Sequence, residues 1–277
     1  MKVACLQYKS DQSEEETLRK ILPLIDKTAK KNVDLITLPE CSTFLNKTSS
    51  ETFKNAKDEK NSLTLKIIRE KAKELDINIL IGSLQTLDLK KSIQKVFNRS
   101  FLINNKGKII CKYDKIHMFD VKISKTNTYQ ESKTYESGNS AKIGKIKVNG
   151  KYYKIGMTIC YDVRFPYLFR DLAIHGADII TVPSVFMKIT GEAHWHSLLR
   201  ARAIETGCFI VAPAQCGSYF DQRESYGHSL IISPWGKILK DAKTNKRIII
   251  SSINKDEIKK ARSKIPSIYF EKKYEIN

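Results

Sequence analysis

The segment from Lys154 to Phe169, KIGMTICYDVRFPYLF, constrains the fold most strongly, because an apolar strand pattern stops at Cys160 and a helical pattern begins beyond Pro166. A strand that turns directly into a helix places the residue at the turn on the rim of a sheet. The N–H groups of the following turn point toward that residue, so they would lower the pKa of a thiol and could hold an oxyanion. The segment therefore predicts a strand-to-helix elbow with Cys160 as a candidate nucleophile. The alternative is that Cys160 is a small apolar core residue, as many intracellular cysteines are.

The length of 277 residues allows a large buried core, and no Pro-, Gly- or Ser-rich linker divides the chain. The N-terminal MKVACLQYKS enters a strand pattern without an apolar signal region, and no apolar run approaches the length of a membrane span. We therefore expect one domain over residues 1–277, with about 266–277 as a C-terminal tail. The same features predict a soluble, cytoplasmic protein without a membrane partner.

Six cysteines are widely spaced, and none forms a CxxC pair or a Cys/His cluster at zinc spacing. A chain of this length without an export signal is not expected to depend on disulfides. The cysteine pattern therefore predicts free thiols and no structural metal.

The charge balance is strongly basic, with 49 Lys and Arg against 30 Asp and Glu, a formal net charge of +19. A basic face can bind nucleic acid through phosphate contacts. Here, however, the excess is mostly lysine spread along the chain, and no helix-turn-helix, RNA-recognition or zinc-finger pattern accompanies it. We expect a solvated, lysine-rich surface and no nucleic-acid partner.

The order of strand-like and helix-like segments predicts two similar halves. Helical spacing is expected over residues 12–31, about 60–75, about 166–175 and 194–206. Three strand-like strings of the first half are answered in the same order in the second: VDLITLPE (33–40) by ADIITVPS (177–184), NILIGSLQ (78–85) by FIVAPAQ (209–215), and RSFLINNKGKII (99–110) by HSLIISPWGKIL (228–239). Buried strands between helices need both faces covered, so we expect an α/β four-layer αββα sandwich. The other reading is that any α/β protein yields look-alike strings.

Two charged residues accompany Cys160 as candidates. Glu40 follows a strand and a proline, just beyond a strand end, where open α/β sheets place their sites. A partly desolvated carboxylate there would have a raised pKa suited to a general base, although a helix cap or a surface ion pair is the alternative. Lys115 lies in CKYDKIHMFD between a strand and a loop, and by itself could be a solvated lysine. Nearby, His117 could be a base, but we expect a packed or hydrogen-bonding histidine. Asp162 and Arg164 are expected to form a structural ion pair, with substrate contact as the alternative.

These motifs, LPE ending at Glu40, YDKIHMF around Lys115 and ICYDVRFP around Cys160, together resemble those of the carbon-nitrogen hydrolase (nitrilase) superfamily. The similarity runs from Val3 to about Tyr269. In addition, TYQESKTYESG (128–138) matches the segment of the family's second glutamate, and TGEAHWHSLLRARAIET (190–206) and SYGHSLIISPWGKIL (225–239) look most like the branch of deaminated-glutathione amidases and omega-amidases.

The resemblance implies a role for each matching residue. Glu40 would take the proton of Cys160, whose thiolate attacks an amide carbon, and would later activate the water that hydrolyses the thioester. Lys115 and the backbone N–H of Tyr161 would face the oxyanion, and Glu131 would pair with Lys115. This chemistry needs neither a metal nor an organic cofactor.

The resemblance also implies a partner and a pocket. Phe186 and Thr190 are the expected substrate-contacting residues, and the helices after the elbow are expected to form a homodimer. The chain departs from the family pattern at Glu192, where relatives usually carry proline, and at His196, where they usually carry glutamate; His196 could also be only an exposed helix residue.

The expected substrate is a small amide of a dicarboxylic 2-oxo acid, with deaminated glutathione first and 2-oxoglutaramate second. A basic surface would favour such anions kinetically. The alternative from another class is a catalytically silent nitrilase-like binding protein.

Overall fold

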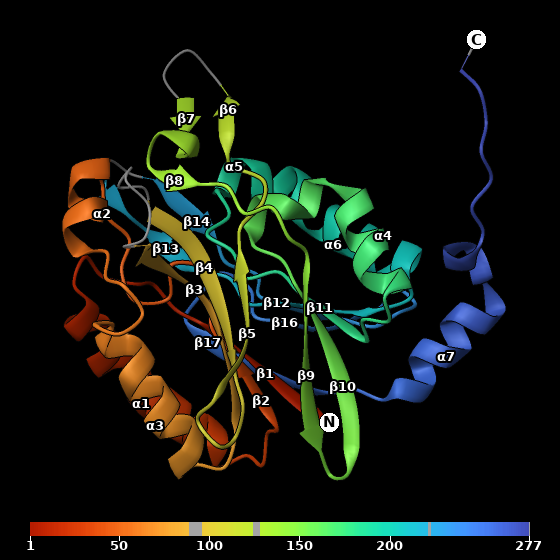
Figure 1. The fold of residues 1–277 in the computed structure, drawn as a ribbon, viewed down its shortest axis with the longest axis horizontal. Helices are drawn as coiled ribbons and strands as arrows, with labels where there is room; N and C mark the ends of the chain where they lie inside the picture. The colour runs from red at the N-terminus through yellow and green to blue at the C-terminus, as the bar shows by residue number, and fades with distance from the viewer. Residues whose placement is uncertain (89–95, 124–127, 221–222, 277) are drawn as a thin grey trace.

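The computed structural model describes residues 1–88, 96–123, 128–220 and 223–276, and within them two β-sheets form the centre of the molecule (Figure 1). The first sheet has seven strands, of which six follow one path: β17 (Arg247–Ser252), β1 (Lys2–Gln7), β2 (Leu35–Thr37), β3 (Asn78–Leu87), β4 (Val96–Ile103) and β5 (Ile109–Asp114). The seventh, β8 (Tyr135–Glu136), pairs with β4.

The second sheet has six strands in the order β16 (Ile238–Asp241), β15 (Leu230–Ile232), β12 (Phe209–Ala212), β11 (Ile179–Thr181), β10 (Lys151–Met157) and β9 (Lys142–Val148). Two hairpins stand apart from these sheets: β6 (Asp120–Lys122) with β7 (Thr128–Gln130), and β13 (Cys216–Ser218) with β14 (Glu224–Tyr226). The helices are α1 (Glu14–Ala29), α2 (Ser49–Asn55), α3 (Leu63–Glu74), α4 (Pro166–Ile174), α5 (Lys188–Thr190), α6 (His196–Thr206) and α7 (Lys255–Lys264).

The two sheets pack face to face, as strand β1 illustrates. Its side chains alternate, because successive residues of a strand point to opposite faces. Ala4 and Leu6 pack with the apolar sides of α1 and α3, whereas Val3 and Cys5 pack in the core shared with the second sheet. Helices α4 and α6 cover the outer face of that second sheet (Figure 1). The expected four-layer αββα sandwich is confirmed.

The two halves repeat one another in strand order and direction. In the first sheet β1, β2 and β3 are parallel and continue into antiparallel β4 and β5. In the second sheet β10, β11 and β12 are parallel and continue into antiparallel β15 and β16. The three pairs of similar strings therefore occupy equivalent strands. The halves are not independent, because β17, near the end of the chain, pairs with β1 in the first sheet.

The strand that leads to Glu40 is shorter than its apolar pattern suggests. The sequence predicts an apolar strand from Val33 that Pro39 stops, and β2 covers only Leu35–Thr37. Pro39 carries no N–H group for a strand ladder, so the chain leaves the sheet there. Gly82 of β3 makes this exit possible, since a Cβ at residue 82 would lie 2.2 Å from the Leu38 carbonyl oxygen and 2.3 Å from that of Pro39.

The segment after α7 is partly docked. Pro266–Tyr269 forms a 3-10 turn in which Ile268 is buried, and the Arg170 guanidinium of α4 donates to the Phe270 carbonyl oxygen at 3.0 Å. The remaining described residues run away from the body of the molecule (Figure 1).

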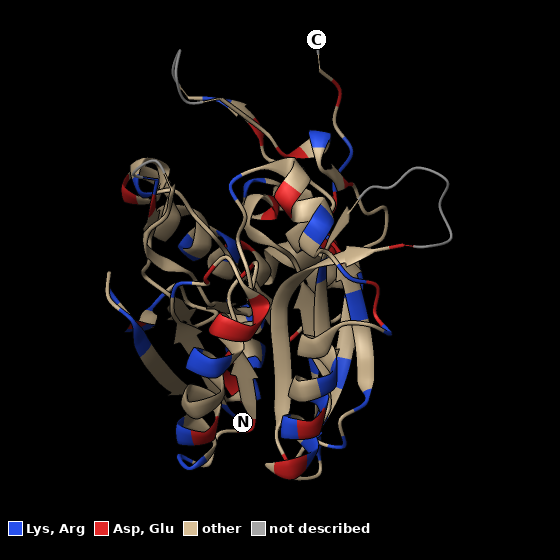
Figure 2. Cartoon of the chain, turned by 90° about the vertical axis from the view of Figure 1, so that its left-hand side faces the viewer, with Lys and Arg blue, Asp and Glu red and all other residues tan. Residues whose placement is uncertain are grey.

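Charged residues are distributed over many elements. Figure 2 shows Lys and Arg on several helices and strand ends, interspersed with Asp and Glu. Among the helices that the structure describes, none combines the length and the apolar character needed to cross a membrane.

We predict that Gly82→Ala lowers the free energy of unfolding by about 1–3 kcal/mol, because the added methyl group collides with backbone rather than with a side chain that can rotate away. Urea unfolding measures this loss. Gly156→Ala in β10 is the matched control, since a Cβ there meets only side-chain atoms at 3.3 Å. Equal losses for the two variants would contradict the proposed backbone constraint.

Candidate active site

A cavity of about 210 Å³ lies where β2, β5 and β10 end, and the sequence-predicted residues meet in it. Its wall includes all seven candidates: Glu40, Lys115, Glu131, Cys160, Tyr161, Phe186 and Thr190. Segments separated by more than a hundred residues therefore form one site.

Cys160 occupies the predicted elbow. It begins a 3-10 turn, Cys160–Arg164, three residues after the end of β10 at Met157. Its own φ is +49°, a left-handed conformation that is uncommon for a residue with a side chain. The Cys160 N–H donates to the Pro183 carbonyl oxygen at 2.9 Å. The first backbone hydrogen bond within the turn runs from the Asp162 N–H to the Ile159 carbonyl oxygen, and Tyr161 is the residue just before that donor. Strand β10 thus presents the thiol at its end, inside the cavity.

The buried Glu40 and Lys115 form an ion-pair chain with the half-buried Glu131. The Lys115 ammonium lies 3.0 Å from Glu40 Oε1 and 2.9 and 2.8 Å from the two oxygens of Glu131. The second Glu40 oxygen accepts the N–H of Val185 at 2.8 Å, and the carboxylate lies close enough to the Cys160 thiol for each group to shift the pKa of the other. Lys115 is 2% exposed and Glu40 4%. The Lys115 side chain is therefore not solvated, and the Glu40 carboxylate faces the thiol.

The sequence analysis missed Asn98 of β4. Its side-chain amide donates to Glu40 Oε1 at 2.9 Å and to Glu131 Oε1 at 3.3 Å, the same two oxygens that the Lys115 ammonium contacts. The backbone carbonyl oxygen of Asn98 also accepts the backbone N–H of Lys115 at 3.0 Å. An asparagine inside a strand carries no spacing signal, and only the pairing of β4 with β5 reveals this role.

The pKa directions in the site correct two expectations. Burial is the largest influence on Glu40 and acts to raise its pKa, but the Lys115 charge and the donated hydrogen bonds outweigh it, so the pKa of Glu40 lies below its usual value. Burial and then the Glu40 charge raise the pKa of the Cys160 thiol well above its usual range. The sequence had suggested a raised pKa for Glu40 and a lowered one for Cys160. Both were wrong because the surrounding donors and charges come from distant segments.

Lys115 is firmly protonated. Burial acts to lower its pKa, but the charges of Glu131 and Glu40 outweigh burial and raise the pKa well above its usual value. The resting site thus holds an ammonium, ionised Glu40 and a protonated thiol.

The expected ion pair between Asp162 and Arg164 is wrong, because Asp162 binds other groups. Its fully buried carboxylate accepts the Ile159 N–H at 2.8 Å and the Tyr113 hydroxyl at 2.6 Å, and the His117 ring nitrogen Nδ1 lies 2.7 Å away. Arg164 instead lies over the aromatic rings of Tyr161 and Phe186. The carboxylate thereby ties the residue before Cys160 to the segment after Lys115.

His117 is a packed, hydrogen-bonding histidine, as expected. Its ring stacks on Phe165 at 3.6 Å and hydrogen-bonds Asp162 and the Tyr167 hydroxyl.

One side of the cavity combines aromatic rings with a cation. Phe186 packs against the buried Trp195 at 4.8 Å, and Thr190 lies in the short helix α5 beside it. Arg223 also lines the cavity, with its guanidinium 5.0 Å from the centre of the Tyr129 ring. The sequence analysis did not single out Arg223, because it lies outside the recognised motifs.

Comparison with known proteins gives the class. A carbon-nitrogen hydrolase family model matches residues 2–263. The chain is 37% identical over 265 residues to the deaminated glutathione amidase of Synechocystis sp. strain PCC 6803, covering 96% of both chains. It is 38% identical to the deaminated glutathione amidase of Dictyostelium discoideum, covering 94% of this chain and 90% of that protein, and 34% identical to that of Homo sapiens, covering 95% and 80%.

Solved structures agree with this match. The C. elegans NitFhit protein superposes with a TM-score of 0.87 at 30% identity, covering 96% of this chain and 63% of that chain. Saccharomyces cerevisiae Nit3, described as a member of branch 10 of the nitrilase superfamily, gives a TM-score of 0.84 at 28% identity, covering 96% and 94%. The fold is that of the nitrilase superfamily. The chain belongs to the carbon-nitrogen hydrolase family, as its motifs had indicated.

We predict that Glu40→Gln lowers the pKa of the Cys160 thiol by at least about one pH unit, because the Glu40 charge disfavours the thiolate. Ultraviolet thiolate absorbance against pH, after subtraction of the same curve for Cys160→Ala, gives the midpoint. Glu192→Gln, which removes an exposed charge outside the ion-pair chain, is the control and should leave the midpoint in place. An unchanged or higher midpoint in Glu40→Gln would show that the carboxylate does not face the thiol.

Proposed function

We propose that the protein is a cysteine-dependent amidase that hydrolyses the amide of a small dicarboxylic 2-oxo acid through a thioester on Cys160, with deaminated glutathione as the first candidate substrate. The observation that carries the proposal is the chain of Cys160, Glu40, Lys115 and Glu131 at one cavity. A catalytically silent binding protein has no need to keep a buried carboxylate against a thiol, and the desolvation of such charges is costly.

The first step uses the resting protonation states. The ionised Glu40 accepts the Cys160 proton as the sulfur attacks the amide carbon, so the thiolate forms only during attack. The high pKa of the thiol is compatible with this order, because the carboxylate that removes the proton lies beside the sulfur. The bond from sulfur to carbon forms while the carbonyl π-electrons move to oxygen.

The developing oxyanion is stabilised by two groups, the Lys115 ammonium and the N–H of Tyr161. One such donor typically contributes about 3–4 kcal/mol to lowering the barrier. Glu131 acts as a positioning residue, since both of its oxygens hold the Lys115 ammonium.

Collapse of the tetrahedral adduct expels the amine, which takes the proton from Glu40. The acyl group remains on Cys160 as a thioester. Water then enters, loses a proton to Glu40 and attacks the thioester carbon. The carbon–sulfur bond breaks, the carboxylic acid product leaves, and the proton held by Glu40 returns to the sulfur to restore the thiol. One carboxylate thus serves as base, acid and base again.

The proposed substrate class rests on a positively charged side chain in the cavity wall and on the names of similar proteins. Arg223 provides a planar, permanently charged donor group that suits a carboxylate. The names of three relatives, deaminated glutathione amidase, support deaminated glutathione, and 2-oxoglutaramate remains the second candidate. Phe186 and Thr190 line the same cavity and are the proposed contacts to the rest of the substrate.

We also propose that the protein is a homodimer, because apolar side chains on α4 and α6 are exposed. Tyr167 and Ile174 of α4 and Ile204 of α6 are 58%, 47% and 53% exposed, and burial of such apolar side chains against a second copy would be favourable.

We propose a cytoplasmic location, because the six cysteines are free thiols and the reducing cytoplasm keeps thiols free.

The test of function is hydrolysis of deaminated glutathione and 2-oxoglutaramate by the wild-type protein and by Cys160→Ala, with release of 2-oxoglutarate as the readout. We expect wild-type activity on deaminated glutathione and a loss of at least about 10³-fold in the variant, because the nucleophile is gone. Intact-mass spectrometry of the wild type during turnover should show the acyl adduct. Hydrolysis of 2-oxoglutaramate alone would select the second substrate, and activity that survives in Cys160→Ala would refute the mechanism.

We also predict that Arg223→Gln raises KM for the anionic amide by about 10-fold or more while kcat changes little, since a charged hydrogen bond that binds substrate and transition state equally affects KM. Steady-state kinetics measures both constants. Lys188→Gln is the matched control, because Lys188 is a neighbouring cation that pairs with Glu224 at 2.7 Å. A similar KM in both variants would remove Arg223 from the substrate site.

A further inference from the structure

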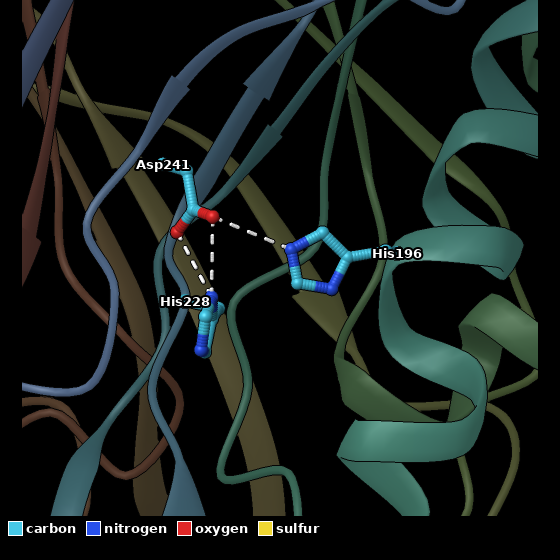
Figure 3. A group of neighbouring side chains, drawn as sticks. All are labelled: His196, His228 and Asp241. Atoms are coloured by element: carbon cyan, nitrogen blue, oxygen red, sulfur yellow. Dashed lines mark hydrogen bonds and ion pairs between the residues drawn. The ribbon is translucent and has the colours of Figure 1, made fainter.

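A second cluster of polar side chains lies on the second sheet, and the amidase proposal does not use it. It consists of His196 at the start of α6, His228 just before β15 and Asp241 at the end of β16 (Figure 3). All three are half-buried, and their potential ligand atoms lie within 4.8 Å of one another. Figure 3 shows both imidazole rings directed at the carboxylate.

The donor atoms lie close to the spacing of a metal site, with each imidazole within hydrogen-bond distance of the carboxylate and all three donors within 4.8 Å of one another. His228 Nδ1 lies 3.0 and 3.2 Å from the two Asp241 oxygens, and His196 Nε2 lies 3.4 Å from Oδ2. In a tetrahedral zinc site with bonds of about 2.0–2.1 Å, donor atoms lie about 3.3–3.4 Å apart. A small closing movement of the two rings would complete this arrangement, with the fourth position open to water.

The surroundings orient the donors. The Lys243 N–H donates to Asp241 Oδ1 at 2.8 Å, and the Tyr226 hydroxyl lies 3.5 Å from His196 Nδ1, the ring nitrogen that faces away from the carboxylate. Such partners fix the ring orientation of metal-binding histidines. The His228 backbone is itself held at both polar groups, because its N–H donates to the Lys243 carbonyl at 2.7 Å and its carbonyl accepts the Trp195 ring N–H at 2.8 Å.

One charge competes with a metal ion. The Lys243 ammonium lies 3.0 Å from Asp241 Oδ2. Its side chain is 66% exposed, so it can swing into solvent at little cost when a divalent cation replaces it.

We propose that His196, His228 and Asp241 bind one divalent cation of the late first transition row, with Zn²⁺ as the first choice. Two imidazoles and a carboxylate are a donor set that suits Zn²⁺ and other ions of this group. The bound ion would join the start of α6 to strands β15 and β16. Sequence spacing did not reveal this site, because its residues are 32 and 13 positions apart and meet only through the sheet.

Residues next to this cluster also contact the wall of the active-site cavity. The residue before His196 is Trp195, whose ring packs on Phe186 of the cavity wall, and Tyr226 donates its N–H to the Phe186 carbonyl at 2.8 Å. A cation that holds the start of α6 would therefore stabilise this wall as well as the helix.

The experiment measures Zn²⁺ binding to the full chain carrying Cys160→Ala, so that the cavity thiol does not compete. We expect one tight Zn²⁺ per chain by competition with a chromophoric chelator, and a Zn²⁺-dependent rise in Tm. His196→Gln, which retains a side chain able to hydrogen-bond Asp241, should weaken binding by about 100-fold or more and abolish the rise. Asp241→Asn, a second variant of unchanged shape, should do the same.

The matched control is His175→Gln, which removes an exposed histidine whose Nδ1 contacts the Asp171 carbonyl. It should bind Zn²⁺ as the parent does. Equal affinity in the parent and His196→Gln would overturn the proposal, as would a parent without any Zn²⁺-dependent rise in Tm. Co²⁺ substitution adds a spectroscopic criterion: a thiolate charge-transfer band would place the ion on cysteine and also refute the site. None of these readouts depends on amidase activity.

Discussion

The ion-pair chain of Glu40, Lys115 and Glu131 is the constraint on which the rest of the site depends. Removing three charges from water is costly, and here each is compensated by the others and by N–H donors of Val185 and Asn98. Two carboxylates and one ammonium leave an excess negative charge beside Cys160. Burial of Cys160, and then the Glu40 charge, raise the pKa of the thiol well above its usual range, so in the proposed mechanism the proton moves during attack. In that mechanism the carboxylate whose charge disfavours the thiolate also receives its proton.

The approximate symmetry of the sandwich brings these groups together. The segment after β2 carries Glu40, and the segment after the equivalent strand β11 carries Val185, whose N–H binds the Glu40 carboxylate. Corresponding ends of the two sheets therefore meet at one cavity. Neither half contains a complete site, because the carboxylate and ammonium come from the first half and the thiol from the second.

Asp162 joins the two supporting segments. Its buried carboxylate holds the backbone just before Cys160 and the ring and N–H of His117, two residues beyond Lys115. A rigid connection of this kind matters because positioning errors near 1 Å can cost a large part of a catalytic rate. Gly82 also helps to position Glu40, since the absence of a side chain at Gly82 lets the Glu40 segment leave the sheet. The site is thus held by backbone contacts that lie outside it.

The local pattern of residues determined the helices, the core strands, the elbow at Cys160 and the motifs that indicate the family, because strand alternation, helical spacing and turn chemistry act over a few residues. The full lining of the cavity depended on more, because Asn98 of β4 and Arg223 just before β14 belong to segments that only the folded chain brings to the same cavity. The pKa directions of Glu40 and Cys160 were decided by the tertiary structure alone. A pKa reflects burial and the charges within a few ångströms, and for these two residues those charges come from segments that only the packed sheets bring together.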